Sequence, residues 1–369
     1  MINPLFFLTD CYGGRGGIAQ YNRNLIRALS LIKKTKKITI FQRKVIYKKE
    51  KIPNKVKLIR NINNSKFQFL IISIHYLFFG KKHDAVVCCH IHLLPFAWIL
   101  SIKNRCPLIL VIFGEEAWNP TKHKISNYLC KKIKYLISIR HYTAKKFLKW
   151  NKLHNFKYFY LPNCVDLLNY KNIVKNKKII SKYKLKNYKI IISCARLDIE
   201  DKNKGVDEII EVLDGLSKRV SNIKYIVIGD GNDKKRLELK AKLLDVEHMV
   251  IFLGNIEEKK KIEFYKLGNV MAMPGSRKTF DRYPYRFVNL EGLASGMHVL
   301  SSNLKYKSDL KDKNIKMFNQ VNPNNKKEII QKLNILLKKK NKISSNLKNF
   351  SFNNFRKKVQ NFVLKNNLN

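Results

Sequence analysis

The stretch Ile191-Ile-Ser-Cys-Ala-Arg-Leu197, followed after a polar loop by Lys204-Gly-Val-Asp-Glu208, is the part of the chain that best indicates its fold. The first segment is a short apolar run that ends near Arg196, and the second opens an amphipathic helical pattern. Because ligands of parallel α/β sheets bind at the carboxyl ends of the strands, Arg196 and Lys204 are expected at one such edge. Two cations there suit a departing diphosphate, although two fortuitous cations would look the same in a chain with 75 Lys and Arg residues.

Strand-like and helix-like patterns alternate on both sides of this stretch, which is typical of α/β layering around mostly parallel sheets. They form two series, separated by a turn at Pro162-Asn163 and a lysine-rich stretch. The sequence therefore predicts one domain over 1–170 and a second over 171–345. The expected strands are 5–8, 38–41, 85–89, 108–113, 135–138, 189–194, 224–228, 249–253, 270–273 and 298–301, and the clearest helices are 18–32, 206–219, 234–244 and 259–267.

The composition limits the classes of function. With 369 residues and 45% hydrophobic content the chain can bury two cores, and a formal net charge of +49 favours an anionic partner. Lysine is spread over the whole chain without a recognised nucleic-acid-binding pattern, so biased composition explains the charge better than nucleic-acid binding, and an anionic membrane surface stays open. The apolar runs 67–79 and 93–102 are shorter than the ~20 residues that span a bilayer, so they are interpreted as buried elements or as segments with an interfacial face.

Seven scattered cysteines form no C-x-x-C pair, which argues against a disulfide framework or a zinc site and fits a reducing compartment. The first residues lack the basic segment and cleavage site of a signal peptide. A cytoplasmic protein is therefore expected.

The glycine-rich turn that contains Gly16 and Gly17 follows the first expected strand and opens a helix. Glycines let the backbone approach an anion closely, and a helix N-terminus offers free amides to a phosphate. An ordinary strand–helix turn explains the pattern equally well. Gly229, in the turn after another buried strand, has the same two interpretations.

A further helix begins near Phe287 and Val288, whose amides would face an anion. Glu291 lies one turn later, where its carboxylate could accept both hydroxyls of a ribose. This arrangement predicts a nucleotide at the start of that helix.

Taken in this order, these segments resemble the family 4 retaining glycosyltransferases, also described as glycosyl transferases group 1, which have the GT-B fold. The match is densest in the second half, at Arg196, Lys204-Gly205, Gly229-Asp-Gly231, Phe252-Leu-Gly254, Pro274 and Leu290-Glu-Gly-Leu-Ala-Ser-Gly296. The resemblance implies two Rossmann-like, doubly wound domains that face each other across a cleft. It also implies that a C-terminal helix within 346–369 crosses back to the first domain.

The resemblance assigns a role to each matched residue. Arg196 and Lys204 would bind the donor diphosphate, Glu291 the ribose, and the backbone from Leu253 to Ile256 the base, while Gly16-Gly17 would approach the phosphates. The expected donor-binding set is Gly16, Gly17, Arg196, Lys204, Gly229, Leu253, Ile256, Phe287, Val288 and Glu291. The donor would be a nucleotide-diphosphate sugar, and the resemblance implies neither a metal nor a cofactor.

Two positions depart from the family pattern. Tyr283 stands where a glutamate usually holds a hydroxyl of the donor sugar, and we expect Asp281 to take that role. Phe113 stands where a histidine usually lies beside the sugar, which makes His90, His92 or Glu115 a candidate for that role. His90 and His92 would point the same way on a strand, and an ordinary packed histidine is the alternative. The expected catalytic residues are Arg196, Lys204, Asp281 and His90.

The sequence thus predicts a retaining, metal-independent glycosyltransferase that acts on a lipid-linked or polysaccharide acceptor in cell-surface glycan synthesis, for example of lipopolysaccharide, O-antigen or capsule. It would be peripheral at the inner membrane face and bind no specific nucleic acid. Two alternatives stay open: a GT-B scaffold with impaired catalysis, which the two departures would explain, and a basic nucleic-acid-binding protein.

Overall fold

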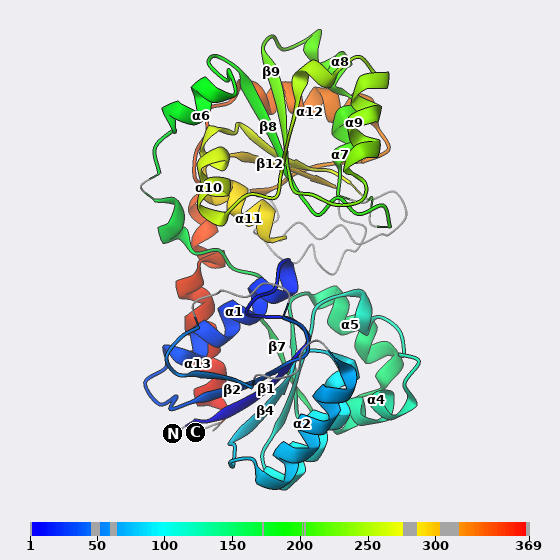
Figure 1. The fold of residues 1–369 in the computed structure, drawn as a ribbon, viewed down its shortest axis with the longest axis vertical. Helices are drawn as coiled ribbons and strands as arrows, with labels where there is room; N and C mark the ends of the chain where they lie inside the picture. The colour runs from blue at the N-terminus through cyan, green and yellow to red at the C-terminus, as the bar shows by residue number, and fades with distance from the viewer. Residues whose placement is uncertain are drawn as a thin grey trace. The chain divides into compact units, whose positions relative to one another are not determined.

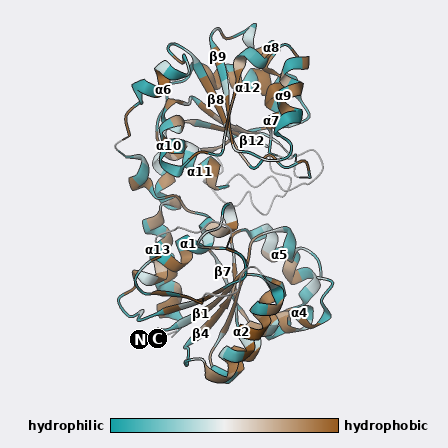
Figure 2. Cartoon of the chain, in the orientation of Figure 1, coloured by the Kyte–Doolittle hydropathy of each residue, from teal (hydrophilic) through white to brown (hydrophobic). Residues whose placement is uncertain are grey.

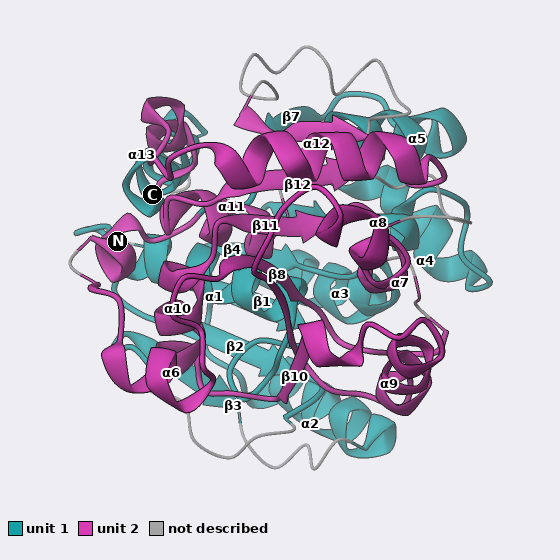
Figure 3. Cartoon of the chain, turned by 90° about the horizontal axis from the view of Figure 1, so that it is seen from above, with its two compact units in different colours: residues 1–164, 352–369 teal, residues 165–351 magenta. Residues whose placement is uncertain are grey.

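The computed structural model describes residues 2–45, 52–59, 65–171, 173–200, 202, 204–275, 286–302 and 317–366. The chain forms two compact units, Met1–Cys164 with Phe352–Asn369, and Val165–Ser351 (Figure 3). The sequence placed these divisions at 170/171 and 345/346 instead. They differ because Val165 forms a bridge with Ser351 and its amide donates to the carbonyl of Phe350, so both flanking segments belong to unit 2.

Unit 1 is built on a seven-stranded sheet whose strands are all parallel (Figure 1). In sheet order these are β3 (Val56–Ile59), β2 (Ile38–Gln42), β1 (Pro4–Leu8), β4 (Ala85–Cys88), β5 (Leu108–Ile112), β6 (Tyr135–Ser138) and β7 (Lys157–Tyr160). The central strands are short apolar runs because helices cover both of their faces.

Two groups of helices cover the two faces of this sheet. On one face, α1 (Gly17–Ser30) packs against the C-terminal helix α13 (Phe352–Lys365). On the other, one apolar cluster joins the strands to α2 (Lys66–Phe79), α3 (Leu94–Asn104), α4 (Lys124–Leu129) and α5 (His141–Asn151). The last helix of the chain therefore belongs to unit 1.

Unit 2 has a six-stranded sheet, which is also parallel. Its order is β10 (Val250–Gly254), β9 (Ile223–Ile228), β8 (Lys189–Cys194), β11 (Val270–Met273), β12 (His298–Ser302) and β13 (Asn319–Val321). Its helices are α6 (Lys177–Lys182), α7 (Val206–Ile210), α8 (Leu213–Ser217), α9 (Lys234–Leu243), α10 (Glu258–Leu267), α11 (Phe287–Ala294) and α12 (Lys326–Lys338).

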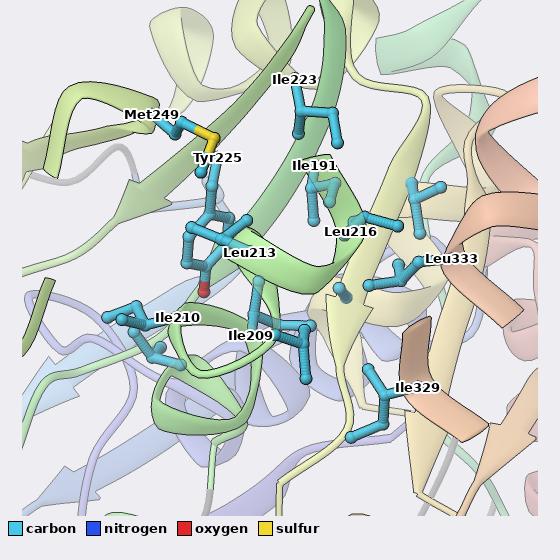
Figure 4. Packing of buried hydrophobic residues seen from close by; sticks show 14 of the residues in the cluster. Ile191, Ile209, Ile210, Leu213, Leu216, Ile223, Tyr225, Met249, Ile329 and Leu333 are labelled. Atoms are coloured by element: carbon cyan, nitrogen blue, oxygen red, sulfur yellow. The ribbon is translucent and has the colours of Figure 1, made fainter. Parts of the chain in front are cut away.

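The core of unit 2 gathers Ile191 of β8, Tyr225 of β9 and Leu333 of α12 with their neighbours (Figure 4). The helix expected over 206–219 is two helices, α7 and α8. Leu213 and Leu216 of the second helix are fully buried, because the break turns it into this core.

Each sheet has one point where the strand order reverses. In unit 1 this point lies between β1 and β4, and in unit 2 between β8 and β11. At such a point the connections leave in opposite directions, which opens a crevice at the carboxyl ends of the two strands. The predicted class, α/β with two doubly wound parallel sheets, is confirmed, and it defines where ligands of each unit would bind.

Among the described residues, no helix combines the length and the apolar character that crossing a membrane requires.

Candidate functional site

The loop after β8 carries Arg196 to the point where the sheet order of unit 2 reverses. Its backbone is held by neighbours, since the amide of Leu197 donates to the carbonyl of Asp230 at 3.0 Å and the amide of Asp233 donates to the carbonyl of Leu197 at 3.0 Å. The Arg196 side chain is 73% exposed, and its Nη2 lies 3.1 Å from Oδ2 of Asp198. A rigid backbone thus presents a solvent-accessible guanidinium at the sheet edge.

Gly229 supports this loop through close backbone contact. Its φ is 133°, and a Cβ at this position would lie only 1.8 Å from the carbonyl oxygen of Ala195. Its amide also donates to the carbonyl of Gly254 at 2.9 Å. The need for glycine here is therefore explained by the packing of the loop that carries Arg196, which is one of the two interpretations that the sequence left open, and the role of Gly229 in donor binding stays a prediction.

Lys204 and Gly205 bring the start of α7 to the same edge. Gly205 caps α7 with a φ of 95°, and a Cβ there would lie 2.6 Å from the backbone nitrogens of Pro274 and Gly275, which follow β11. The Ser302 hydroxyl, at the end of β12, donates to the carbonyls of Pro274 and Gly275. The half-buried Lys204 thus lies where the ends of β8, β11 and β12 meet.

Helix α11 begins at Phe287 and carries Glu291 one turn later. Its N-cap residue, Arg286, makes no side-chain capping bond, and the first amides of a helix, here those of Phe287 and Val288, have no partner inside it. These amides and the positive end of the helix dipole favour an anion.

The Glu291 carboxylate is 12% exposed and lies against two side chains of α10. Its Oε2 is 3.1 Å from Nζ of Lys261 and accepts a hydrogen bond of 3.2 Å from the hydroxyl of Tyr265. Lys261 also pairs with Glu258 at 2.9 Å. Glu291 is therefore held in one orientation and retains acceptor capacity, because a carboxylate offers about four lone-pair sites.

The electrostatics of this cluster follow from burial. Burial raises the pKa of Glu291, and the ammonium of Lys261 offsets part of that rise. For Lys261 burial acts to lower the pKa, but the carboxylates of Glu291 and Glu258 act against it, and the pKa lies above its usual range. Burial raises the pKa of the neighbouring Cys194 thiol to about 11, so this thiol stays protonated at neutral pH.

Sequence reasoning missed Lys261, Tyr265 and Cys194 as neighbours of Glu291. Lys261 and Tyr265 lie one helical turn apart on α10, and their contacts with Glu291 span 30 and 26 positions of sequence, respectively, between two helices. The sequence pattern that could have indicated this contact is the spacing of four positions between Lys261 and the buried Tyr265, which puts the two on the same side of the helix. This spacing alone does not identify Glu291 as their partner.

The residues predicted to contact the base of the nucleotide also lie at this edge. Leu253 is the last residue but one of β10 and Ile256 follows the strand, and both are half-buried. Because β10 pairs with β9, and β9 with β8, these residues reach the same carboxyl edge as Arg196. The structure thus brings Arg196, Lys204, Leu253, Ile256, Phe287, Val288 and Glu291 to one side of unit 2.

In unit 1, the switch point holds Gly16, Gly17 and His90. Gly16 caps α1 with a φ of 95° and no side-chain cap, and both glycines are exposed. His90 follows β4, the neighbour of β1. Because the carboxyl ends of parallel strands share one edge, the structure brings these three residues to the same side of unit 1.

The sequence predicted that His90 and His92 lie on a strand, and this prediction is wrong. β4 ends at Cys88, and Ile91–Leu93 is a turn of 3-10 helix that His90 caps, with its Nδ1 accepting from the amide of His92 at 3.2 Å. Burial, with positive neighbours at His92 and Arg43, lowers the pKa of His90 to about 4. His90 is therefore neutral at pH 7 and can act only as a neutral donor or acceptor there.

Phe113, at the position where the family usually has a histidine, is buried in a ring contact of 5.4 Å with Tyr21. The carboxylate of Glu116 turns back and accepts from the amides of Phe113 and Gly114 at 2.6 and 2.8 Å. These contacts make this turn a structural one. The predicted catalytic residue Asp281, and Tyr283 beside it, lie outside the described residues.

One group of described side chains has the proximity of metal ligands, namely Asp245, Glu247 and His248, all exposed. They precede β10 and therefore lie at the amino edge of the sheet, opposite to Arg196. They have no bearing on the candidate site, and the absence of a metal requirement stays a prediction.

Comparisons with known proteins agree with this architecture. Residues 175–353 match the family model described as Glycosyl transferases group 1. A protein of Methanocaldococcus jannaschii described as an uncharacterized glycosyltransferase is 28% identical over 116 residues, which is 31% of this chain and 27% of that relative's length.

Two solved structures resemble nearly the whole chain. The crystal structure of HepE from Anabaena in complex with UDP has a TM-score of 0.73 and 15% identity, over 98% of this chain and 99% of that one. The lipopolysaccharide outer core galactosyltransferase WaaB, in its apo form, has a TM-score of 0.68 and 15% identity, over 98% and 99% of the two chains. At this identity the likeness concerns the fold, and it confirms GT-B.

Proposed function

Because residues 175–353 match the family model of glycosyl transferases group 1, we propose that the chain transfers a sugar, with retained configuration, from a nucleoside-diphosphate donor to a hydroxyl of a lipid-linked or polysaccharide acceptor. The donor nucleotide binds at the carboxyl edge of unit 2. The observation that carries this proposal is the placement of Glu291, a buried carboxylate with spare acceptor capacity, one turn inside an uncapped helix at that edge.

Three groups at this edge match the parts of a nucleoside diphosphate. Glu291 accepts hydrogen bonds from the ribose hydroxyls, and the half-buried Leu253 and Ile256 contact the base. The amides of Phe287 and Val288 and the cations Arg196 and Lys204 bind the phosphates. The match in type and order supports the assignment of the donor to unit 2.

Catalysis on this proposal is electrostatic. As the bond between the sugar and the diphosphate breaks, negative charge grows on the departing phosphate, and Arg196 and Lys204 stabilise it as an oxyanion hole stabilises its oxyanion. Because these cations supply the positive charge, we propose that no metal is required. Gly16 and Gly17 approach the phosphates, and His90 and Asp281 bind the donor sugar.

The nucleotide and the acceptor are proposed from relatives. The HepE protein of Anabaena forms complexes with UDP and with UDP-glucose, so a UDP-sugar is the first donor to test. WaaB is described as acting in the lipopolysaccharide outer core, which favours an acceptor of a cell-surface glycan. We place the reaction at the inner face of the membrane.

A transfer assay tests this function directly. The chain is incubated with a panel of UDP- and GDP-sugars, and release of the nucleoside diphosphate is measured with and without a chelator. Release that survives chelation is expected. If the chelator abolishes release, after buffer controls, the proposal that no metal is required is wrong. If no donor gives release, the alternative of a GT-B scaffold with impaired catalysis is favoured.

The substitution pair Asp281→Asn and Tyr283→Phe tests the departure from the family pattern in the same assay. We expect Asp281→Asn to lower turnover far more than Tyr283→Phe, because a carboxylate is the group that holds a sugar hydroxyl. The reverse ranking would discard Asp281 as its ligand.

The alternative of a nucleic-acid-binding protein rests on the net charge of +49. Retention on DNA would not discriminate, since a basic enzyme also binds polyanions. Retention that persists at moderate salt, without any effect of UDP or GDP on the melting temperature, would favour it.

A further inference from the structure

Helix α2 of unit 1 has large apolar side chains on its exposed side as well as on its buried side, with Lys66 and His75 as the polar residues among the exposed ones. Phe69 and Ser73 are buried against the sheet, and Ile72 and Tyr76 pack against the same cluster. The opposite side is exposed, with Phe67 and Phe78 each 69% exposed and Phe79 77% exposed. A helix that is hydrophobic all round is normally covered on all sides, and this side of α2 has no such cover among the residues that the structure describes.

The exposed residues form one continuous stripe, which we call the α2 patch. Their spacing by three and four positions places them on one helical face. The α2 patch consists of Phe67, Leu70, Ile71, Ile74, Phe78 and Phe79. Figure 2 shows α2 coloured brown over much of its length. On the neighbouring α3, Ile99 and Ile102 are exposed as well, so apolar surface continues beyond one helix.

The charge around the α2 patch is positive. Exposed basic residues stand at both ends of α2 and at the end of α3, namely Lys66, Lys81, Lys82, Lys103 and Arg105. Between positions 65 and 114 the sequence has a single acidic residue, Asp84, whose Oδ2 accepts from the backbone amide and the side-chain amide of Asn3. This stretch of the chain thus offers several exposed cations and one carboxylate, which is already hydrogen-bonded to Asn3.

We propose that the α2 patch inserts into the interface of a membrane that carries anionic lipids, with the lysines at its ends against the headgroups. This inference rests on the proposed function, because it supplies the surface by which unit 1 reaches a lipid-linked acceptor. An amphipathic surface that combines aromatic and aliphatic side chains with lysines is the type that lies in the headgroup region. The aliphatic stems of the lysines can stay in the apolar layer while their ammonium groups reach the phosphates.

A second copy of the chain is the competing occupant, and charge argues against it. Two α2 patches packed face to face would bring the lysines of both copies together, with one carboxylate, already hydrogen-bonded to Asn3, near each. Like charges in a desolvated interface are destabilising. An anionic bilayer meets both the apolar stripe and the cations at its ends.

Vesicle co-sedimentation of the full chain tests the proposal. The vesicles contain either phosphatidylcholine alone or phosphatidylcholine and phosphatidylglycerol in equal parts. The test variant is Phe67→Ser with Phe78→Ser and Phe79→Ser. The matched control is Leu168→Ser with Leu239→Ser and Leu243→Ser, which removes three exposed leucines from unit 2, two of them on the lysine-rich helix α9.

We expect the parent chain and the control to bind anionic vesicles, and the test variant to bind at least about tenfold more weakly. The parent should bind zwitterionic vesicles more weakly, and Lys81→Gln with Lys82→Gln should reduce only the anionic component. Equal loss in the control and the test variant, or no loss in either, would overturn the role of the α2 patch.

Sedimentation velocity without lipid tests whether a second copy of the chain, rather than a membrane, covers the α2 patch. If the test variant converts a dimer to a monomer and leaves vesicle binding unchanged, the patch is a dimer interface and the proposal is wrong. UDP binding, measured by thermal shift in each variant, separates this inference from the proposed function. Because the α2 patch lies outside unit 2, the expected shift equals that of the parent even where vesicle binding is lost.

Discussion

Two buried carboxylates of unit 2, Asp207 and Glu291, have nearly the same exposure and very different partners. The Asp207 side chain is 10% exposed and that of Glu291 is 12% exposed. Arg236 donates to both oxygens of Asp207 at 2.8 and 2.7 Å, and Lys240 adds a contact at 2.5 Å. Glu291 has one ammonium, which lies 3.1 Å from Oε2 and 3.3 Å from Oε1, and one hydroxyl, which donates to Oε2 at 3.2 Å.

The difference appears in the pKa values. Burial acts to raise the pKa of Asp207, but the hydrogen bonds of Arg236 and Lys240 outweigh it and hold the pKa at about 2. Burial raises the pKa of Glu291, and Lys261 only partly offsets that rise. The Asp207 carboxylate, whose acceptor positions are largely used by Arg236 and Lys240, joins the two helices α7 and α9. The Glu291 carboxylate has fewer partners and lies at the carboxyl edge of the sheet, where it can bind a ligand. The comparison teaches that burial alone does not separate structural from functional carboxylates.

The largest effect that this comparison predicts is that of Glu291→Gln on activity. The substitution removes the charge that strengthens two ribose hydrogen bonds, so kcat/KM for the nucleotide sugar should fall by about 100-fold, or ~3 kcal/mol. Steady-state kinetics measure this. Asp207→Asn is the matched control, assayed at a temperature where both variants are folded. A loss that is equal in the two variants would contradict the distinction.

Asp207→Asn should have the opposite profile, with about 3 kcal/mol lost from the free energy of unfolding, because Arg236 and Lys240 lose a buried partner. Urea titration measures it. The pKa of Asp207 in the folded chain lies below its ordinary value of 3.8. The stabilisation is therefore complete above about pH 4 and is lost as the pH falls towards about 2, so the difference between parent and variant should disappear over that window. A difference that stays constant down to pH 2 would exclude this carboxylate as its source.

Lys261→Met tests how Glu291 is kept ready for its ligand. Without the ammonium, burial raises the pKa of Glu291 further, and affinity for the nucleoside diphosphate should fall about tenfold at neutral pH. Because only the ionised carboxylate binds ribose well, affinity should recover as the pH rises. Calorimetric titration across pH measures this, with Lys261→Arg as the control that keeps the charge. A pH-independent loss would indicate a purely structural lysine.

Tyr265→Phe should have the smallest effect. It removes one hydrogen bond of 3.2 Å from Glu291 and leaves the ring in place. Affinity should fall only about threefold, because the hydroxyl acts on the ligand through the orientation of the carboxylate, which Lys261 continues to hold. If the loss in titration matched that of Lys261→Met, the hydroxyl rather than the ammonium would orient the carboxylate.

The positions of strand ends could be predicted from the sequence, and with them the residues at the edge of unit 2. Arg196 and Lys204 were located because a short apolar run must end where its polar neighbours begin, and parallel strands align those ends. Glu291 was located by its distance from a helix start. These are local patterns, which do not depend on contacts between distant elements.

What could not be predicted depends on contacts between distant elements. Lys261 contacts Glu291 across 30 positions, and no local pattern encodes that pair. The close approach of Gly229 to Ala195 depends on how two loops pack, so a ligand role and a packing role were equally open. His90 does not lie on a strand, as the sequence predicted that it would, because it caps the 3-10 turn formed by Ile91–Leu93.

The central claim, that unit 2 binds a nucleoside diphosphate whose ribose is recognised by Glu291, is tested most directly by thermal shift with UDP and 2′,3′-dideoxy-UDP at moderate salt. The account predicts that UDP raises the melting temperature of the parent chain, that the dideoxy analogue raises it much less, and that Glu291→Gln responds weakly and equally to both. An equal response of parent and Glu291→Gln to UDP, or none in the parent to either UDP or GDP, would contradict it.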